Sequence, residues 1–161
     1  MSDRGKGRGV AEDGRCLEWT ADLELGVAEV DHEHRQWFAL VRRFLKAQAE
    51  GRSHEVVYRA LVEAILYTES HFASEMAVMR AAGYPGADAH ERLHAWAWRK
   101  IHAYTEGSVP EEVICAELGQ FLPQWLFTHI QSADRVFADW LRGRGAADAA
   151  NATGPALPLA S

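Results

Sequence analysis

Apolar residues recur at three- and four-residue steps over four long stretches of the chain, which is the spacing of one face of an α-helix. Short segments containing Gly or Pro separate these stretches, and none of the stretches shows the alternation of a β-strand. We therefore predict helices at about residues 31–50, 54–82, 87–106 and 111–142. Short connections make neighbouring helices antiparallel, so the pattern predicts an all-α, up-down-up-down antiparallel four-helix bundle.

Local signals mark the ends of these helices. Asp31 is suited to cap the first helix, Gly51 to end it, and Pro110 to begin the fourth, where its missing N–H leaves no helical bond unmade. Pro123 lies inside the fourth predicted helix and removes the hydrogen bond to the carbonyl group of Gly119. We therefore predict a kink at this position.

The segments outside the periodic pattern differ in character. Residues 1–15 are charged and Gly-rich and residues 143–161 are rich in small residues, so we expect a disordered leader and a disordered C-terminal tail. Residues 17–30 contain well-spaced apolar side chains, and we predict an ordered N-terminal arm that packs over one end of the bundle. The predicted domain, a single four-helix bundle, spans residues 16–142.

Composition narrows the class of protein further. A chain of 161 residues with 48% apolar and 25% charged residues is typical of one soluble domain. The net charge of -6 argues against non-specific nucleic-acid binding, and no apolar run approaches the roughly 20 residues of a membrane-spanning helix. The N-terminus has no apolar signal segment, and Cys16 and Cys115 are isolated. We therefore expect a cytoplasmic protein without membrane or nucleic-acid partners.

Histidine and carboxylate residues occur on all four predicted helices. His71 and Glu75 are four residues apart, as are His90 and His94, so each pair shares one face of its helix. The turn at residues 83–86 should fold the second pair back against the first. Each residue alone would more often lie at the surface, but their joint placement beside apolar neighbours predicts a buried metal site. The candidate ligands are His34, His71, Glu75, His90, His94, His129 and Asp134.

The donor types restrict the metal. The set is rich in imidazole and lacks thiolate, which argues against a structural zinc site and against calcium or magnesium. Seven ligands are too many for one ion, and His with carboxylate suits iron, with manganese as the alternative. Two octahedral ions offer about twelve positions, of which the seven side chains and one bridging hydroxide fill about eleven. We therefore predict two iron ions with one open position for a small ligand.

Two details of the candidate set need a structural answer. His129 and Asp134 are five residues apart, about 140° around an ideal helix. Either a local widening of the helix or a side chain reaching across it would bring them together. The remaining histidines, His32, His54 and His102, should lie at the surface or support the site from outside.

The chain resembles the hemerythrin family, specifically its single-domain bacterial members, over about residues 19–140. The matching motifs are V-D-H-E-H at 30–34, H-F-x-x-E at 71–75, G-Y-P followed by H-x-x-x-H at 90–94, and W-L-x-x-H-I-x-x-x-D at 125–134. Two features depart from the family pattern: Met76, where a second acidic residue is common, and Pro123, whose kink would lie close to a ligand.

The resemblance implies a role for each candidate. His90, His94 and His129 would bind one iron, His34 and His71 the other, and Glu75 and Asp134 would bridge them. O2 would bind at the iron with two histidines, and Trp125 and Leu126 would line the O2 pocket.

The resemblance also implies reversible O2 binding for carriage, storage or sensing, rather than catalysis. The partners of such a protein would be O2 and an O2-using enzyme or a redox protein. The alternative is a di-iron enzyme that acts on peroxide or nitric oxide at the same open position. Iron storage or a sensory module is a third, weaker alternative.

Overall fold

The computed structural model describes residues 17–105 and 107–152, and within them every element is helical. A 3-10 helix, η1, lies in the N-terminal arm, and a π-helix, η2, joins two α-helices without a break. The elements are η1 (Ala21–Leu23), α1 (Ala28–Ala49), α2 (His54–Ala82), α3 (Ala87–Thr105), α4 (Glu111–His129), η2 (Ile130–Asp134) and α5 (Arg135–Ala152).

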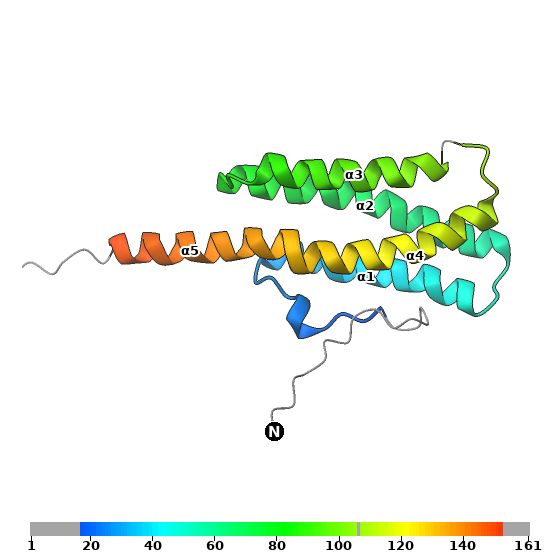
Figure 1. Ribbon diagram of the computed structural model, residues 1–161. Helices are drawn as coiled ribbons and strands as arrows, with labels where there is room; N and C mark the ends of the chain where they lie inside the picture. Colours follow the sequence, from blue (N-terminus) through cyan, green and yellow to red (C-terminus); the bar gives the residue numbers. More distant parts are fainter. Residues whose placement is uncertain (1–16, 106, 153–161) are drawn as a thin grey trace, which may run out of the picture.

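The helices form the predicted antiparallel bundle. Helix α1 contacts α2 and α4, and α3 likewise contacts α2 and α4, so the helices close around one interior (Figure 1). Because α4, η2 and α5 are continuous, they act as the fourth rod of the bundle (Figure 1). None of the described helices is long and apolar enough to cross a lipid bilayer.

The arm is fixed to the bundle at the start of α1. Helix α1 begins at Ala28, three residues before Asp31, so the prediction that Asp31 caps this helix is wrong. Its buried carboxylate instead accepts hydrogen bonds from the backbone N–H groups of Leu25 and Gly26, at 2.7 and 2.9 Å. This arrangement orders the end of the arm. Leu23 and Leu25 are buried, as predicted, and Leu17 is buried as well.

The last helix runs to Ala152, past the end predicted at residue 142. Alanine is the best helix former, and Gly143 and Gly145 do not have the positive φ with which glycine ends a helix. Arg142 also donates to the carbonyl of Leu25 at 2.7 Å, which holds α5 against the arm. The rest of the predicted tail, residues 153–161, and the predicted leader lie outside the described residues.

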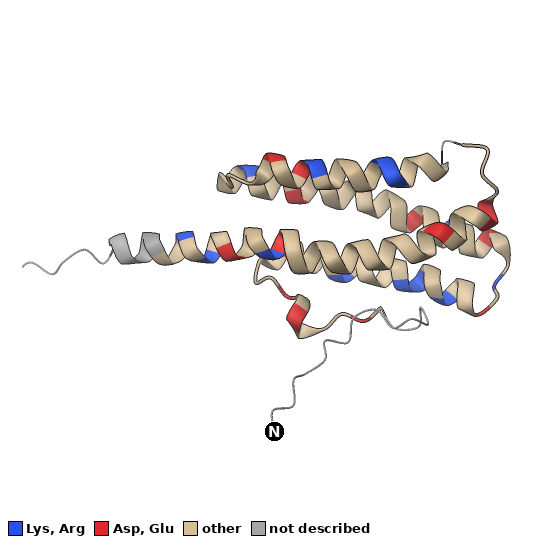
Figure 2. Cartoon of the chain, in the orientation of Figure 1, with Lys and Arg blue, Asp and Glu red and all other residues tan. Residues whose placement is uncertain are grey.

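The fourth rod carries no charged residue along the stretch that faces the centre of the molecule. From Leu118 to Ala133 there is no Asp, Glu, Lys or Arg, and the corresponding ribbon is tan throughout in Figure 2. Pro123 is buried within α4, which remains helical on both sides of it; the predicted kink stays a prediction. The bundle interior therefore has an apolar wall on this side.

Candidate metal centre

All seven candidate ligands point into the bundle interior, and each is at most 5% exposed. Helix α1 contributes one of them, α2 and α3 contribute two each, α4 contributes one, and η2 contributes the last. In chain order they are His34, His71, Glu75, His90, His94, His129 and Asp134.

Three imidazoles, which we call the three-histidine group, form a compact triangle. The Nε2 atoms of His90, His94 and His129 are 3.1, 3.0 and 3.1 Å apart. If these nitrogens occupy one face of an octahedron, its centre lies about 2.2 Å from each, close to the length of a metal–imidazole bond. The triangle thus has the dimensions of a metal site.

Two carboxylate oxygens extend the same octahedron. Oε2 of Glu75 lies 3.1 Å from Nε2 of His90 and 3.2 Å from Nε2 of His94. Oδ1 of Asp134 lies 3.4 Å from Nε2 of His90 and 3.1 Å from Nε2 of His129. These separations match the edges of an octahedron, so five protein donors can surround one ion here.

The other two imidazoles, the two-histidine group, lie on the far side of the carboxylates. Nε2 of His34 is 3.3 Å from Oδ2 of Asp134, and Nε2 of His71 is 3.9 Å from Oε2 of Glu75. His34, His71 and Glu75 can together hold a cation. Asp134 therefore presents one oxygen to each group, and Glu75 lies between them.

Several of these atoms lack a hydrogen-bond partner among the described residues. Nε2 of His34, Nε2 of His71 and Oε1 of Glu75 are buried without one. An unsatisfied buried polar atom costs about 1–3 kcal/mol, and a bound cation would remove that cost for all three. The donor atoms thus fit a metal centre.

The π-helix explains how His129 and Asp134 meet. Residues Ile130–Asp134 adopt a π-helical turn, in which the backbone hydrogen bond joins residues five apart. Positions five apart then face the same direction, and Oδ1 of Asp134 lies 3.1 Å from Nε2 of His129. Of the two alternatives left open by the sequence, the widened helix is the one observed.

Burial and neighbouring groups set the protonation of the cluster. Burial alone would raise the pKa of Glu75, but hydrogen bonds from His90 and His94 hold that pKa well below its usual value. Burial and the charge of Glu75 would also raise the pKa of Asp134, yet His129 lowers it. Burial lowers the pKa of His94 to about 4. At neutral pH the carboxylates are therefore anionic and His94 is neutral, the forms that bind cations.

One contact next to the cluster was not predicted from the sequence. Glu33, on α1, accepts a hydrogen bond from Nδ1 of His71 at 2.8 Å and another from the hydroxyl group of Ser74 at 2.7 Å. Partial burial raises the pKa of Glu33, but these two hydrogen bonds outweigh it and lower the pKa. Only the packing of α1 against α2 reveals this contact, because nothing in the spacing of residues 33, 71 and 74 brings them together.

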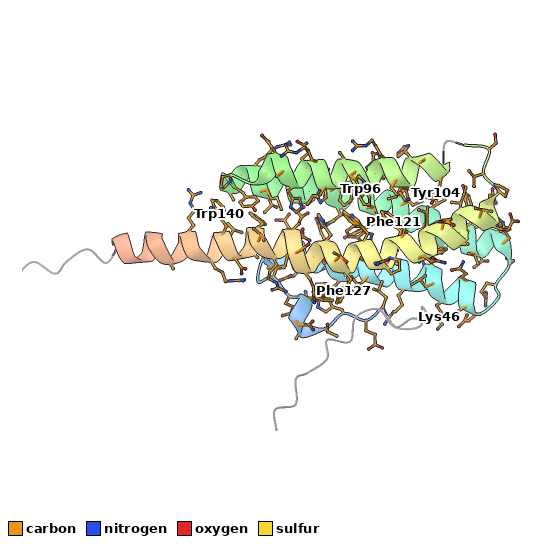
Figure 3. The ribbon with its side chains drawn as sticks, viewed as in Figure 1. Lys46, Trp96, Tyr104, Phe121, Phe127 and Trp140 are labelled. Atoms are coloured by element: carbon orange, nitrogen blue, oxygen red, sulfur yellow. The ribbon has the colours of Figure 1, made fainter. Side chains whose placement is uncertain are left out.

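Aromatic rings surround both groups. Phe72 stacks on His94 with ring centroids 3.8 Å apart, and Trp125 stacks on His129 at 4.3 Å. The ring centroids of Trp37 and His71 are 4.9 Å apart, and Trp37 is fully buried. Further out, Trp96 and Phe121 pack together between α3 and α4 (Figure 3). Aromatic side chains therefore contact members of both groups.

The residues predicted to line an O2 pocket lie close to the cluster. Leu126 is fully buried, but Trp125 stacks on a member of the three-histidine group. A cavity of about 420 Å³ between α2 and α3 is bordered by Met76 and reaches His94. Both Trp125 and the cavity are thus next to the three-histidine group. Trp37, which lies beside His71 of the two-histidine group, was not predicted from the sequence.

The other histidines lie outside the cluster, as predicted. His32 is exposed and hydrogen-bonds Gln36 at 2.8 Å, and His54 is exposed and pairs with Glu111 at 3.2 Å. His102 packs against Trp98, with ring centroids 4.5 Å apart.

Comparison with known proteins agrees with this geometry. Residues 25–141 match the family model described as the hemerythrin HHE cation binding domain. A bacteriohemerythrin of Stenotrophomonas maltophilia is 33% identical over 126 residues, covering 78% of this chain and 82% of that protein. One from Pseudomonas aeruginosa is 32% identical with the same coverage, and one from Ralstonia nicotianae is 30% identical over 130 residues, covering 80% and 91%. The chain therefore belongs to the hemerythrin family.

Proposed function

We propose that this protein binds O2 reversibly at a non-haem di-iron centre. His90, His94 and His129 would bind one iron and His34 and His71 the other, with Glu75 and Asp134 bridging the two. The observation that carries the proposal is the unequal number of donors around two shared carboxylates. Five protein donors surround one position and four the other, so a shared hydroxide would leave one position open, on the two-histidine side.

Held by these residues, an iron pair would provide a reversible two-electron exchange with O2. The protein would keep this exchange reversible by excluding water and protons from the centre. The uncharged stretch of the fourth rod, residues 118–133, supplies an apolar wall, and Leu126 on it is fully buried. The two anionic carboxylates would offset part of the charge of the iron ions, while the imidazoles remain neutral donors.

The geometry favours a binding protein over an enzyme. Turnover of peroxide or nitric oxide would need a group that delivers protons to the open position. Among the described residues, Glu33 is an ionisable side chain outside the ligand set that contacts His71, and both of its oxygens already accept hydrogen bonds. We therefore propose a cytoplasmic O2 carrier, store or sensor, served by an O2-using enzyme or a redox partner.

Anaerobic loading with ferrous iron tests the proposal. We expect two irons per chain, a visible absorption band on exposure to air, and loss of that band under vacuum. His71→Ala should retain about one iron and lose the band, whereas the matched variant His32→Ala, at an exposed position on α1, should retain both. A single zinc per chain would contradict the di-iron centre. Irreversible O2 uptake, or steady turnover of peroxide or nitric oxide, would contradict the carrier.

A further inference from the structure

One polar side chain next to the cluster is not part of the proposed ligand set. Glu33 lies on α1, is 21% exposed at its side chain, and reaches across to α2. Its Oε2 atom accepts a hydrogen bond from Nδ1 of His71, and its Oε1 atom accepts one from Ser74, three residues further along the same helix. Both oxygens of one carboxylate are thus held by adjacent turns of α2.

We infer that Glu33 is a positioning residue that orients His71 and increases its electron donation to the iron of the two-histidine group. This inference rests on the proposed function.

Glu33 determines the tautomer of His71. Because Nδ1 donates its proton to Glu33, Nε2 carries the free lone pair. That Nε2 atom is the one turned toward the cluster, 3.9 Å from Oε2 of Glu75, and it has no hydrogen-bond partner among the described residues. Glu33 therefore fixes the ring in the form and rotation that a metal requires.

The negative charge of Glu33 also acts on His71. A carboxylate that accepts the remote N–H of a ligating imidazole makes the other nitrogen a stronger donor. A stronger donor stabilises ferric over ferrous iron, so Glu33 lowers the reduction potential on the two-histidine side. Ser74 contributes by holding the second oxygen of Glu33 at 2.7 Å, which restricts rotation of the carboxylate.

The contact with Glu33 distinguishes His71 from other histidines of the cluster. Nδ1 of His34 and Nδ1 of His94 are not hydrogen-bonded in this way; Nδ1 of each is buried without a partner among the described residues. His71 thus has a carboxylate on its remote nitrogen while a member of each histidine group does not. The effect of Glu33 is directed at the iron where the open position is proposed.

If Glu33 only held α1 against α2, removing its side chain would have a similar effect. Glu33→Gln separates the two roles. The amide oxygen of glutamine can still accept from Nδ1 of His71, so the tautomer and packing are kept while the negative charge is lost. Glu33→Ala removes both the orientation and the charge. Glu29→Ala is the matched control, because Glu29 is exposed and lies one turn earlier on the same helix.

Iron affinity, measured by chelator competition, and the midpoint potential of the centre are the readouts. Thermal unfolding of the metal-free variants checks that each folds. We expect Glu33→Ala to bind the second iron about 10–100-fold more weakly. Glu33→Gln should retain two irons with a higher midpoint potential than wild type, and Glu29→Ala should match wild type in both.

The outcomes separate this inference from the proposed function. If wild type binds two irons and O2 reversibly but Glu33→Gln and Glu33→Ala match it in affinity and potential, the role of Glu33 is overturned and the function stands. If Glu33→Gln restores wild-type potential as well as affinity, Glu33 is only a helix tie and the inference also fails. If wild type binds no iron pair, the proposed function itself fails.

Discussion

The two histidine groups occupy the same cluster but are built differently. In the three-histidine group, the nitrogens lie within 3.1 Å of one another, and two carboxylate oxygens each lie 3.1 Å from one of them, so these five atoms could fill five of the six positions around one octahedral ion. In the two-histidine group, His34 and His71 share those carboxylates but have no third imidazole. The protein therefore encloses one position more fully than the other.

The difference follows from how the helices use one spacing. In α3, the pair four residues apart, His90 and His94, contributes both side chains to the same group. In α2, the pair with the same spacing is divided: His71 belongs to the two-histidine group and Glu75 lies between the groups. A four-residue spacing can thus place both side chains in one histidine group, or place one side chain in a group and the other between the two groups. Which of these occurs depends on where the helix crosses the cluster.

The largest effect should come from the shared residue. Glu75→Gln keeps the size of the side chain but removes its negative charge. It also replaces one carboxylate oxygen, a candidate metal ligand, with an amide N–H group. Because Glu75 contacts members of both groups, we expect the iron content to fall below one per chain, measured by elemental analysis after anaerobic loading. Glu69→Gln, at an exposed position on the same helix, should retain two irons. Two irons in Glu75→Gln would show that the groups bind independently.

The pH dependence of the metal-free protein should be smaller but measurable. The pKa of His94 is about 4 in the folded protein against 6.5 for an unperturbed histidine. Between these values the unfolded chain binds a proton that the folded protein does not. Stability is therefore retained above about pH 6.5 and lost as pH falls toward 4, by up to about 3 kcal/mol.

Urea unfolding at a series of pH values checks this loss. His94→Gln removes the titrating group, so its free energy of unfolding should fall less steeply over the same pH range than that of wild type. Equal slopes would mean that burial does not keep His94 neutral before metal binds.

The sequence predicted those features that depend on local spacing. Helix α2 begins at His54 and ends at Ala82 as predicted, and Gly83 adopts the positive φ of 70° that lets the chain turn. The seven candidate ligands were found because histidines and carboxylates recur on the apolar faces of all four helices.

Other features depend on contacts between distant segments and could not be read from spacing. Asp31 has the chemistry of a helix cap, but its carboxylate is used by the arm instead. Glu33 meets His71 only because α1 packs on α2 in one particular register. The choice between a widened helix and a reaching side chain at Asp134 likewise depended on the tertiary fit of the fourth rod.

The smallest effect should come from the tryptophans that lie beside the two histidine groups. Trp37 lies beside His71, whereas Trp125 stacks on His129. If the open position is on the two-histidine side, Trp37→Leu should change the barrier to O2 release by about 1 kcal/mol, about fivefold in rate. Trp125→Leu should change it less. Stopped-flow release of O2 measures both rates, and Trp140→Leu, in a separate apolar cluster, is the control. A larger change in Trp125→Leu would instead place the open position beside the three-histidine group, where the cavity reaches His94.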